Sequence, residues 1–223
     1  MRPWSAGDDC LILLREYQYL TPHLMAELRG PDRKEAIRLE QKNLNRLFRE
    51  GKVNRTPYLE AGRCLGAPTW VYYLSKTAGR WTLDHELALT EYHIRLRKLC
   101  DEQHWDLAWQ QRHMAGAFYP DAYFCLKGLH FFLEIERQNY GNLLHGVSSI
   151  MRKANNYYAY YGSEQCRTRW NFDRFRVIFQ LHRIAPADFI SKLEHQHRLY
   201  WVGIPGSLDY MTPKDPRITF IDV

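Results

Sequence analysis

Two apolar, strand-like runs flank Lys127 and Gly128. Their pairing determines which side chains of the two strands lie opposite one another. The runs cover residues 119–126 and 129–137. Because glycine tolerates a positive φ angle, Lys127-Gly128 predicts a two-residue hairpin turn. Symmetric pairing about that turn places Leu126 opposite Leu129, and the register of every further pair follows from this one. We therefore expect a tight β-hairpin.

Three acidic side chains share one face of this expected hairpin. The register places Asp121 opposite Glu134, and strand alternation puts Glu136 on the same face. Opposed like charges destabilise a strand pair, so a counter-ion is expected. A hard divalent cation bound by carboxylate oxygens would offset the repulsion. The alternatives are a different turn register, or a Glu136 that points into solvent at the end of its strand.

Helix and strand periodicities around the hairpin predict the element order αβββαβαβ. The helices cover residues 83–100, 146–161 and 187–198, and the strands cover 105–112, 119–126, 129–137, 175–181 and 199–203. In the second of these helices, the apolar spacing predicts a buried stripe that runs through Ile150 and Ala154 to Tyr158 and Tyr161.

A second basic and aromatic stretch follows within this part of the chain. Its cations are Arg152, Lys153, Arg167, Arg169, Arg174 and Arg176, and its aromatic residues are Tyr157, Tyr158, Tyr160, Tyr161 and Trp170. Such a composition is typical of surfaces that follow a DNA backbone or stack unpaired bases. The alternative for Tyr158 and Tyr161 is the core position that the helical spacing predicts.

The first part of the chain predicts three helices followed by a hairpin. Thr21 and Pro22 start the second helix, and Gly30 ends it. The helical patterns cover residues 11–20, 22–29 and 33–50, the strand patterns cover 53–55 and 69–74, and the third helix is expected to bury Ile37, Leu44, Leu47 and Phe48. This order of elements is that of a winged helix-turn-helix module.

The net charge of +6 is concentrated in one segment, because residues 29–55 contain nine Lys and Arg against four Asp and Glu. A basic segment in an otherwise balanced chain is typical of a nucleic-acid contact, since outward cations and amides of a helix meet phosphates and base edges in the major groove. The candidates for binding double-stranded DNA are Arg33, Arg38, Gln41, Lys42, Asn45, Arg49, Lys52 and Arg55. The alternatives are a solvated helix face and a winged helix that binds another protein.

Other classes of function find no support in the sequence. No apolar run approaches the ~20 residues that cross a bilayer, so we expect no membrane partner. The five cysteines are odd in number and have no CxxC spacing, which favours reduced thiols in the cytoplasm over disulfides or a zinc site. Glycine-rich phosphate-binding loops are absent, so no nucleotide cofactor is expected.

The motifs FYPDAYF, FFLEIER and RKANNYYAYY, together with LTPHLMAEL, NLNRLFREGKVNR and YYLSKTAGR, give the chain its resemblance to a known family. Over residues 11–204 it resembles the replication-relaxation family of plasmids and other mobile elements. The resemblance implies an α+β fold with two domains. Residues 1–80 would form a winged helix-turn-helix, and residues 81–223 an αβββαβ restriction-endonuclease-like PD-(D/E)xK domain with a central mixed sheet.

The resemblance also implies a site. Asp121 and Glu134 match the metal ligands of the nuclease motif, which would hold Mg²⁺ or Mn²⁺, and Glu136 stands where the motif has its lysine. Some nucleases of this fold carry that lysine on the next helix, where Lys153 is the candidate. We expect catalytic roles for these four residues if the domain is active, with Lys153 as an exposed surface residue the alternative.

Three functions remain open on the sequence. The first is a DNA-binding protein of a mobile element, active in replication or DNA relaxation, whose nuclease-like domain contacts DNA. The second is an active metal-dependent endonuclease or nickase. The third is a scaffold that recruits other replication or transfer proteins, and a homodimer is compatible with all three.

Overall fold

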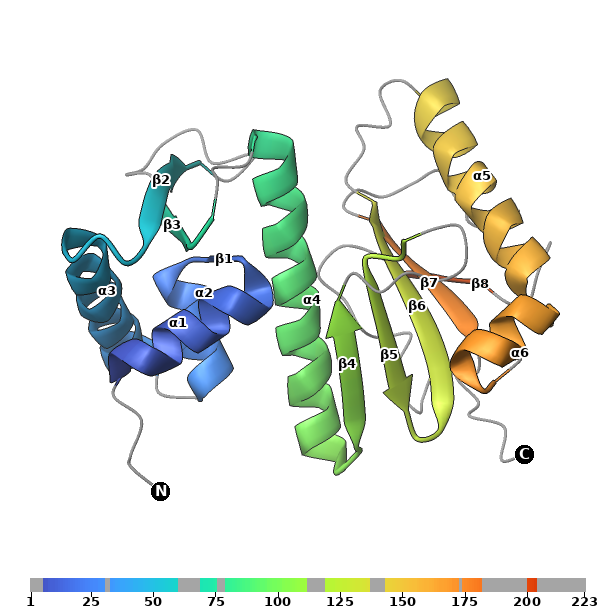
Figure 1. Ribbon diagram of the computed structural model, residues 1–223, viewed down its shortest axis with the longest axis horizontal. Helices are drawn as coiled ribbons and strands as arrows, with labels where there is room; N and C mark the ends of the chain where they lie inside the picture. The colour runs from blue at the N-terminus through green and yellow to red at the C-terminus, as the bar shows by residue number, and fades with distance from the viewer. Residues whose placement is uncertain are drawn as a thin grey trace. The chain divides into compact units, whose positions relative to one another are not determined.

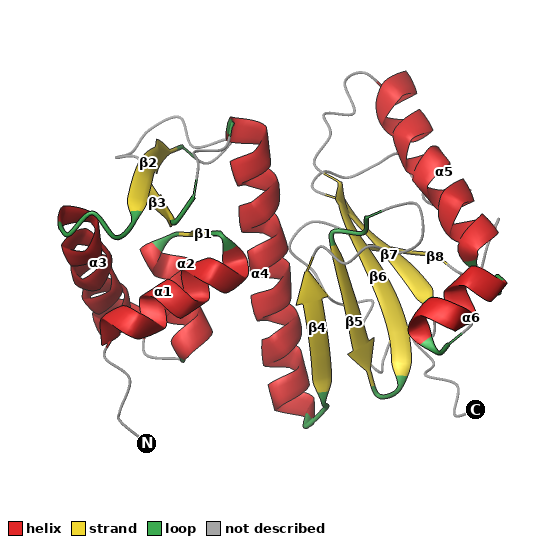
Figure 2. Ribbon diagram, in the orientation of Figure 1, coloured by secondary structure: helices red, strands yellow, loops and turns green. Residues whose placement is uncertain are grey.

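The computed structural model describes residues 6–30, 33–59, 69–75, 79–111, 119–136, 143–172, 174–181 and 200–203. These described residues form six helices and two sheets, one of which is mixed, so the predicted α+β class is confirmed (Figures 1 and 2). The chain divides into two compact units, residues 1–94 and 95–223, and the division falls inside one helix. The boundary expected at residue 80 lies at the start of that helix.

The first unit contains three helices and a small antiparallel sheet of order β1-β3-β2. Its elements are α1 (Ala6–Tyr17), β1 (Tyr19–Leu20), α2 (Pro22–Arg29), α3 (Arg33–Arg49), β2 (Asn54–Tyr58) and β3 (Thr69–Tyr73). The core between the helices and the sheet includes Leu14, Met25, Leu44, Val71 and Tyr72, all at most 1% exposed.

Local sequence explains where α2 begins and where α1 ends. The Thr21 hydroxyl accepts a hydrogen bond from the Leu24 backbone N–H at 3.1 Å, which caps α2 as predicted. The helix expected over residues 11–20 is wrong at its end. Gln18 has a φ of +62°, so α1 stops at Tyr17, and Tyr19 and Leu20 pair with β3 as strand β1.

The buried face of α3 is predicted correctly at Leu44 and Leu47, which are both buried. The prediction that Phe48 is buried is wrong, because its side chain is exposed. Its ring instead lies under the guanidinium of Arg55, with 4.2 Å between the Arg55 Cζ atom and the ring centre. A cation–π contact of this kind gives an aromatic side chain a partner outside the core.

The second unit is built on a five-stranded mixed sheet of order β4-β5-β6-β7-β8. The pairs β4–β5 and β5–β6 are antiparallel, whereas the pairs β6–β7 and β7–β8 are parallel. Helix α4 (Arg80–Gln103) starts in the first unit and continues into this one. The other elements of this unit are β4 (Leu107–Gln111), β5 (Ala122–Leu126), β6 (Leu129–Glu136), α5 (Leu143–Tyr160), α6 (Glu164–Trp170), β7 (Arg176–Leu181) and β8 (Tyr200–Gly203). The helix predicted over residues 187–198 lies outside the described residues.

The hairpin between β5 and β6 has the predicted register. Leu126 pairs with Leu129, and the ladder continues to Ala122 and Leu133. Lys127 and Gly128 have φ angles of +50° and +77°, the positive values that a tight two-residue turn needs.

Helix α5 covers one face of this sheet (Figure 1). Its buried residues Ile150, Ala154, Tyr157 and Tyr160 share a core with residues of β6 and β7, among them Phe132. The stripe predicted through Tyr158 and Tyr161 is wrong, because both side chains are exposed. The helix is rotated so that the hydroxyls of Tyr157 and Tyr160 reach hydrogen-bond partners inside.

Helix α6 was not predicted, because only Cys166 of its seven residues is buried. Ser163 caps it by accepting a hydrogen bond from the Cys166 backbone N–H at 3.1 Å. Across the described parts of the chain, no helix combines the length and the apolar character needed to cross a membrane.

Candidate functional site

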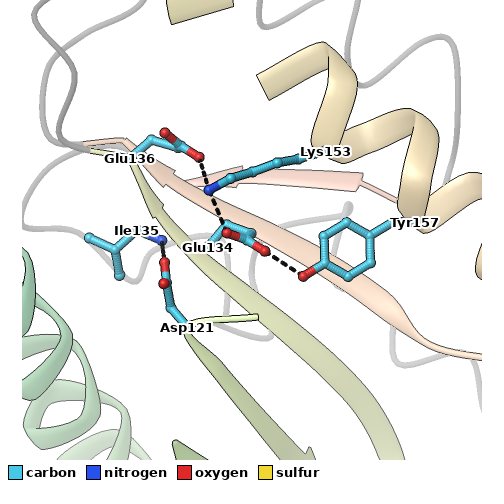
Figure 3. A network of polar contacts seen from close by, with 6 residues as sticks. All are labelled: Asp121, Glu134, Ile135, Glu136, Lys153 and Tyr157. Carbon is cyan, nitrogen blue, oxygen red and sulfur yellow. Dashed lines mark hydrogen bonds and ion pairs between the residues drawn. The ribbon is translucent and has the colours of Figure 1, made fainter. Parts of the chain in front are cut away.

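The end of strand β6 carries two buried carboxylates on the face that helix α5 covers. Glu134 and Glu136 are each 3% exposed, and they lie on the same side of the strand because side chains alternate along it. Lys153 and Tyr157 reach them from α5, where a spacing of four residues places both on one side of the helix (Figure 3). We call Asp121, Glu134, Glu136, Lys153 and Tyr157 the lysine–carboxylate cluster.

Lys153 lies between the two glutamates. Its ammonium nitrogen donates to Oε2 of Glu134 and to Oε1 of Glu136, both at 2.6 Å. The Tyr157 hydroxyl donates to Oε1 of Glu134 at 2.5 Å. Both oxygens of Glu134 therefore accept hydrogen bonds from α5, which fixes the orientation of this carboxylate.

Asp121 directly precedes β5, at the point where the hairpin ladder ends. Its backbone N–H donates to the Leu133 carbonyl oxygen at 3.0 Å, and its Oδ2 accepts from the Ile135 backbone N–H at 2.7 Å (Figure 3). The carboxylate thus takes the place of a main-chain acceptor beside β6. This anchors the negative charge of Asp121 close to Glu134.

Burial and charge shift the pKa values in the cluster. Burial, with a smaller contribution from the charge of Asp121, raises the pKa of Glu134 to about 7. Burial by itself would lower the pKa of Lys153, but Glu134 and Glu136 outweigh it and raise that pKa. Burial and the neighbouring Glu134 raise the pKa of Tyr157 well above its ordinary value. Lys153 is therefore a permanent cation, and Glu134 takes up a proton more readily than an ordinary glutamate.

The structure brings the four predicted catalytic residues into one region of the second unit. The ammonium group of Lys153 is a counter-ion of Glu134 and Glu136, whereas the divalent cation expected for the acidic face stays a prediction. Lys153 is not an ordinary surface lysine, because its side chain is only 34% exposed. Tyr157 was not among the predicted site residues. Its position four residues after Lys153 is the sequence signal that could have identified it.

The chemistry of these donors fits a hard divalent cation. Mg²⁺ and Mn²⁺ prefer carboxylate oxygens and complete their shells with water and phosphate. Asp121 and Glu134 are the residues that would hold the ion, and a bound cation would lower the pKa of Glu134, which burial raises. Within the described segments, no three His, Cys, Asp or Glu side chains are grouped so as to hold a metal ion.

The first unit presents a second candidate surface on α3. The exposed side chains of Arg38, Lys42, Arg46 and Arg49 follow one face of this helix, since they recur at intervals of three or four residues. They border a hollow of about 670 Å³, whose described lining also includes Leu39, Gln41, Asn43 and Asn45. We call this surface the basic face of α3.

Gln41 and Asn45, two of the predicted DNA-binding residues, bond to a core tyrosine. The Gln41 amide donates to the Tyr72 hydroxyl at 2.9 Å, and that hydroxyl donates to Oδ1 of Asn45 at 2.8 Å. Asn45 Oδ1 also accepts from Nη1 of Arg55 at 2.9 Å. These contacts join α3 to strands β2 and β3, so they orient the helix against the hairpin.

Arg55 itself is held between two aromatic rings. Its Cζ atom lies 4.2 Å from the ring centres of both Phe48 and Trp70. With Asn45 as an acceptor, this stacking determines the direction of the guanidinium. Arg55 therefore has a structural role at the junction of α3 and the hairpin, whichever ligand the surface binds.

The other predicted DNA-binding residues differ in their surroundings. Lys52 is exposed and lies 2.9 Å from Glu50, and this hydrogen bond lowers the pKa of Glu50. The side chain of Arg33 lies outside the described residues.

Comparison of the chain with family models, with curated proteins and with solved structures gave no match. The resemblance to the replication-relaxation family therefore stays a prediction.

Proposed function

We propose that this chain is a DNA-binding protein that docks on duplex DNA through the basic face of α3 and brings a nuclease-like second unit to the same molecule. The observation that carries this proposal is the exposed row of Arg38, Lys42, Arg46 and Arg49 beside a hollow of about 670 Å³. The resemblance to the replication-relaxation family suggests plasmids or other mobile elements as its setting, and DNA replication or relaxation as its process.

Charge pairing around α3 supports a polyanionic ligand. The carboxylate of Glu40 is buried and lies 2.9 Å from Arg29, so it does not offset the charge of the exposed face. Glu50 pairs with Lys52 and lies 3.9 Å from Arg46. An exposed row of cations without a matching row of acids attracts phosphate groups, which release counter-ions when they bind.

The order of elements in the first unit also supports the proposal. Three helices precede β2 and β3, and the short β1 joins the same sheet, as expected for a winged helix-turn-helix in which α3 is the groove-binding helix. Gln41 and Asn45 would then orient that helix through Tyr72, and Arg55 would do so through Asn45, while the outward cations meet the phosphates.

The test is the salt dependence of duplex binding. Replacing Arg38, Lys42 and Arg49 together by Ala should weaken binding and flatten the plot of log affinity against log salt by roughly 0.9 per lost phosphate contact. Fluorescence anisotropy with a labelled duplex measures both quantities. The matched control replaces the exposed Arg95, Arg97 and Lys98 of α4 by Ala. An unchanged slope in the α3 variant, or an equal change in the control, would reject DNA docking by α3 and favour the scaffold function.

A second candidate function is metal-dependent cleavage of phosphodiester bonds by the second unit. It is favoured by the contact of Lys153 with Glu134 and Glu136, because the cluster has the lysine that Glu136 replaces in the sequence motif. Its other support is the strand order, in which three antiparallel strands are followed by a crossover helix and a parallel strand, as the PD-(D/E)xK resemblance implies.

The residues have separate roles in this second function. Asp121 and Glu134 would hold Mg²⁺ or Mn²⁺, which supplies charge neutralisation at the phosphate and a more acidic bound water. Tyr157 keeps Glu134 in a fixed orientation through its hydroxyl. The Lys153 ammonium would neutralise charge on the phosphate, and Glu136 holds that ammonium at the site.

Incubation of supercoiled plasmid with the protein and Mn²⁺ tests the second function. Nicked or linear product should form with the unaltered protein and disappear in Asp121→Asn and in Glu134→Gln. Arg97→Gln, an exposed position on α4, serves as the control and should cut normally. Persistent cutting in both site variants would exclude the cluster as the source of the activity.

A further inference from the structure

The outward surface of α5, α6 and the residues leading into β7 is strongly positive. Between residues 143 and 181 the sequence has six cations and only two acids, Glu164 and Asp173. Lys153 belongs to the lysine–carboxylate cluster, and every other cation in this range is an arginine. Arg152, Arg167, Arg169 and Arg174 are exposed. Arginine binds phosphate in a bidentate manner and stacks on planar groups, which lysine does not do.

Carboxylates do not balance this charge within the described residues. No described acid forms an ion pair with Arg152, Arg169 or Arg174. Glu164 is in the first turn of α6, where an acid complements the helix dipole. The exposed cations of α4 differ, since Arg97 and Lys98 are each followed four residues later by an exposed acid, Asp101 or Glu102. The excess positive charge is therefore a feature of the α5–α6 surface.

Two exposed aromatic rings lie in α5 or directly after it. Tyr158 is 56% exposed, although its neighbour Tyr157 and the nearby Tyr160 are buried. Tyr161 is also exposed, and its ring meets that of Phe175 edge-on, with 5.3 Å between ring centres. Tyr158 belongs to α5, and Tyr161 directly follows the last residue of that helix. Aromatic rings beside arginines are the composition of surfaces on which unpaired bases stack.

We propose that the α5–α6 surface binds an unpaired DNA strand. Arg152, Arg169 and Arg174 contact the phosphates, and Tyr158 and Tyr161 stack on bases. The proposal rests on the proposed function in naming DNA as the ligand, but it concerns the other unit and the other form of DNA. Arg152 directly precedes Lys153 in α5, but its side chain is exposed, whereas that of Lys153 reaches the buried Glu134 and Glu136.

The experiment compares an oligothymidylate with a duplex in anisotropy titrations of the full chain over about 50–200 mM salt. Arg169→Gln with Arg174→Gln should weaken binding of the oligothymidylate and flatten its salt dependence by about 0.7 for each arginine. Tyr158→Ala should weaken it roughly fivefold or more, whereas Tyr158→Phe should keep the affinity because the ring remains. The matched control, Arg97→Gln with Lys98→Gln, removes the same charge from α4 of the same chain.

The outcomes separate this inference from the proposed function. Replacing Arg38, Lys42 and Arg49 by Ala should reduce duplex binding and leave binding of the oligothymidylate at its original affinity. Loss of binding in the α5–α6 variants but not in the control supports the inference, even if α3 proves unnecessary for duplex binding. Unaltered oligothymidylate affinity in the α5–α6 variants, or an equal loss in the control, overturns it. Thermal melting of each variant shows that the surface substitutions leave the fold intact.

Discussion

At the scale of single residues, Glu134 is a buried carboxylate whose two oxygens are both held by side chains of α5. It is 3% exposed, and both of its oxygens accept hydrogen bonds, from Lys153 and from Tyr157. Two donors on one carboxylate favour the charged form, but burial and the charge of Asp121 oppose it and raise the pKa to about 7. Glu134 is thus balanced between its two protonation states near neutral pH.

This balance predicts a pH dependence of stability. A pKa raised from 4.5 to about 7 means that the folded chain binds more protons than the unfolded chain between these values. Stability therefore falls as pH rises from ~4.5 to ~7, by about 3 kcal/mol in total from this group. Urea unfolding at several pH values, followed by tryptophan fluorescence, should show a decline that Glu134→Gln removes. The same decline in wild type and variant would contradict the assignment.

The sequence was informative about site residues where geometry is local and failed where burial depended on distant partners. The β5–β6 hairpin made it possible to predict from the sequence that the acids of the cluster lie close together, because a two-residue turn fixes which positions share a face. The sequence left two alternatives for Lys153, since a lysine at the edge of an apolar stripe fits both solvent and a buried carboxylate. Only the parallel pairing of β6 with β7 determines where α5 lies, and hence what Lys153 reaches.

At the scale of elements, helix rotation was the main error. The run Tyr157-Tyr158-Ala159-Tyr160-Tyr161 offers two apolar stripes one residue apart, and tyrosine suits either core or surface. The structure selects Tyr157 and Tyr160, because their hydroxyls meet Glu134 and Trp170 inside. Phe48 on α3 was misplaced for a related reason, since its partner Arg55 is on the following strand.

The contacts of Tyr72 predict that α3 depends on strands β2 and β3 for its orientation. Tyr72→Phe removes the hydroxyl shared by Gln41 and Asn45 and leaves the ring in the core. We expect a loss of about 0.5–1.5 kcal/mol in stability, because two half-buried amide side chains lose a hydrogen-bond partner. Duplex affinity should fall as well, although Tyr72 is 0% exposed and touches no ligand.

Tyr119→Phe is the control for this variant, since Tyr119 is 66% exposed and should change stability by no more than ~0.5 kcal/mol. Denaturant unfolding and duplex titration of the two variants provide the comparison. If Tyr72→Phe binds duplex as the wild type does, α3 does not need this network to hold its orientation.

At the scale of the whole molecule, helix α4 is the element that the two units have in common. It runs from Arg80 to Gln103, and the division between the units falls after Ile94. Residues before this point, such as Leu83 and Leu87, belong to the core of the first unit. A break in the middle of α4 should therefore affect both units.

Arg95→Pro tests this expectation, because proline in a helix interior removes a hydrogen bond and costs about 3 kcal/mol or more. Arg95→Ala, at the same exposed position, keeps the helix and should cost little. Hydrogen exchange followed by mass spectrometry should show faster exchange for peptides of both units in the proline variant. Faster exchange in one unit alone would show that the other does not depend on α4.

All members of the lysine–carboxylate cluster come from one uninterrupted piece of chain, residues 121–157, which contains β5, β6 and most of α5. Strand β7 lies outside this piece, although α5 shares its core with Val177 and Phe179 of that strand. A fragment that ends at Tyr157 therefore has every side chain of the cluster but lacks part of the surface that holds α5, and with it Lys153, in place.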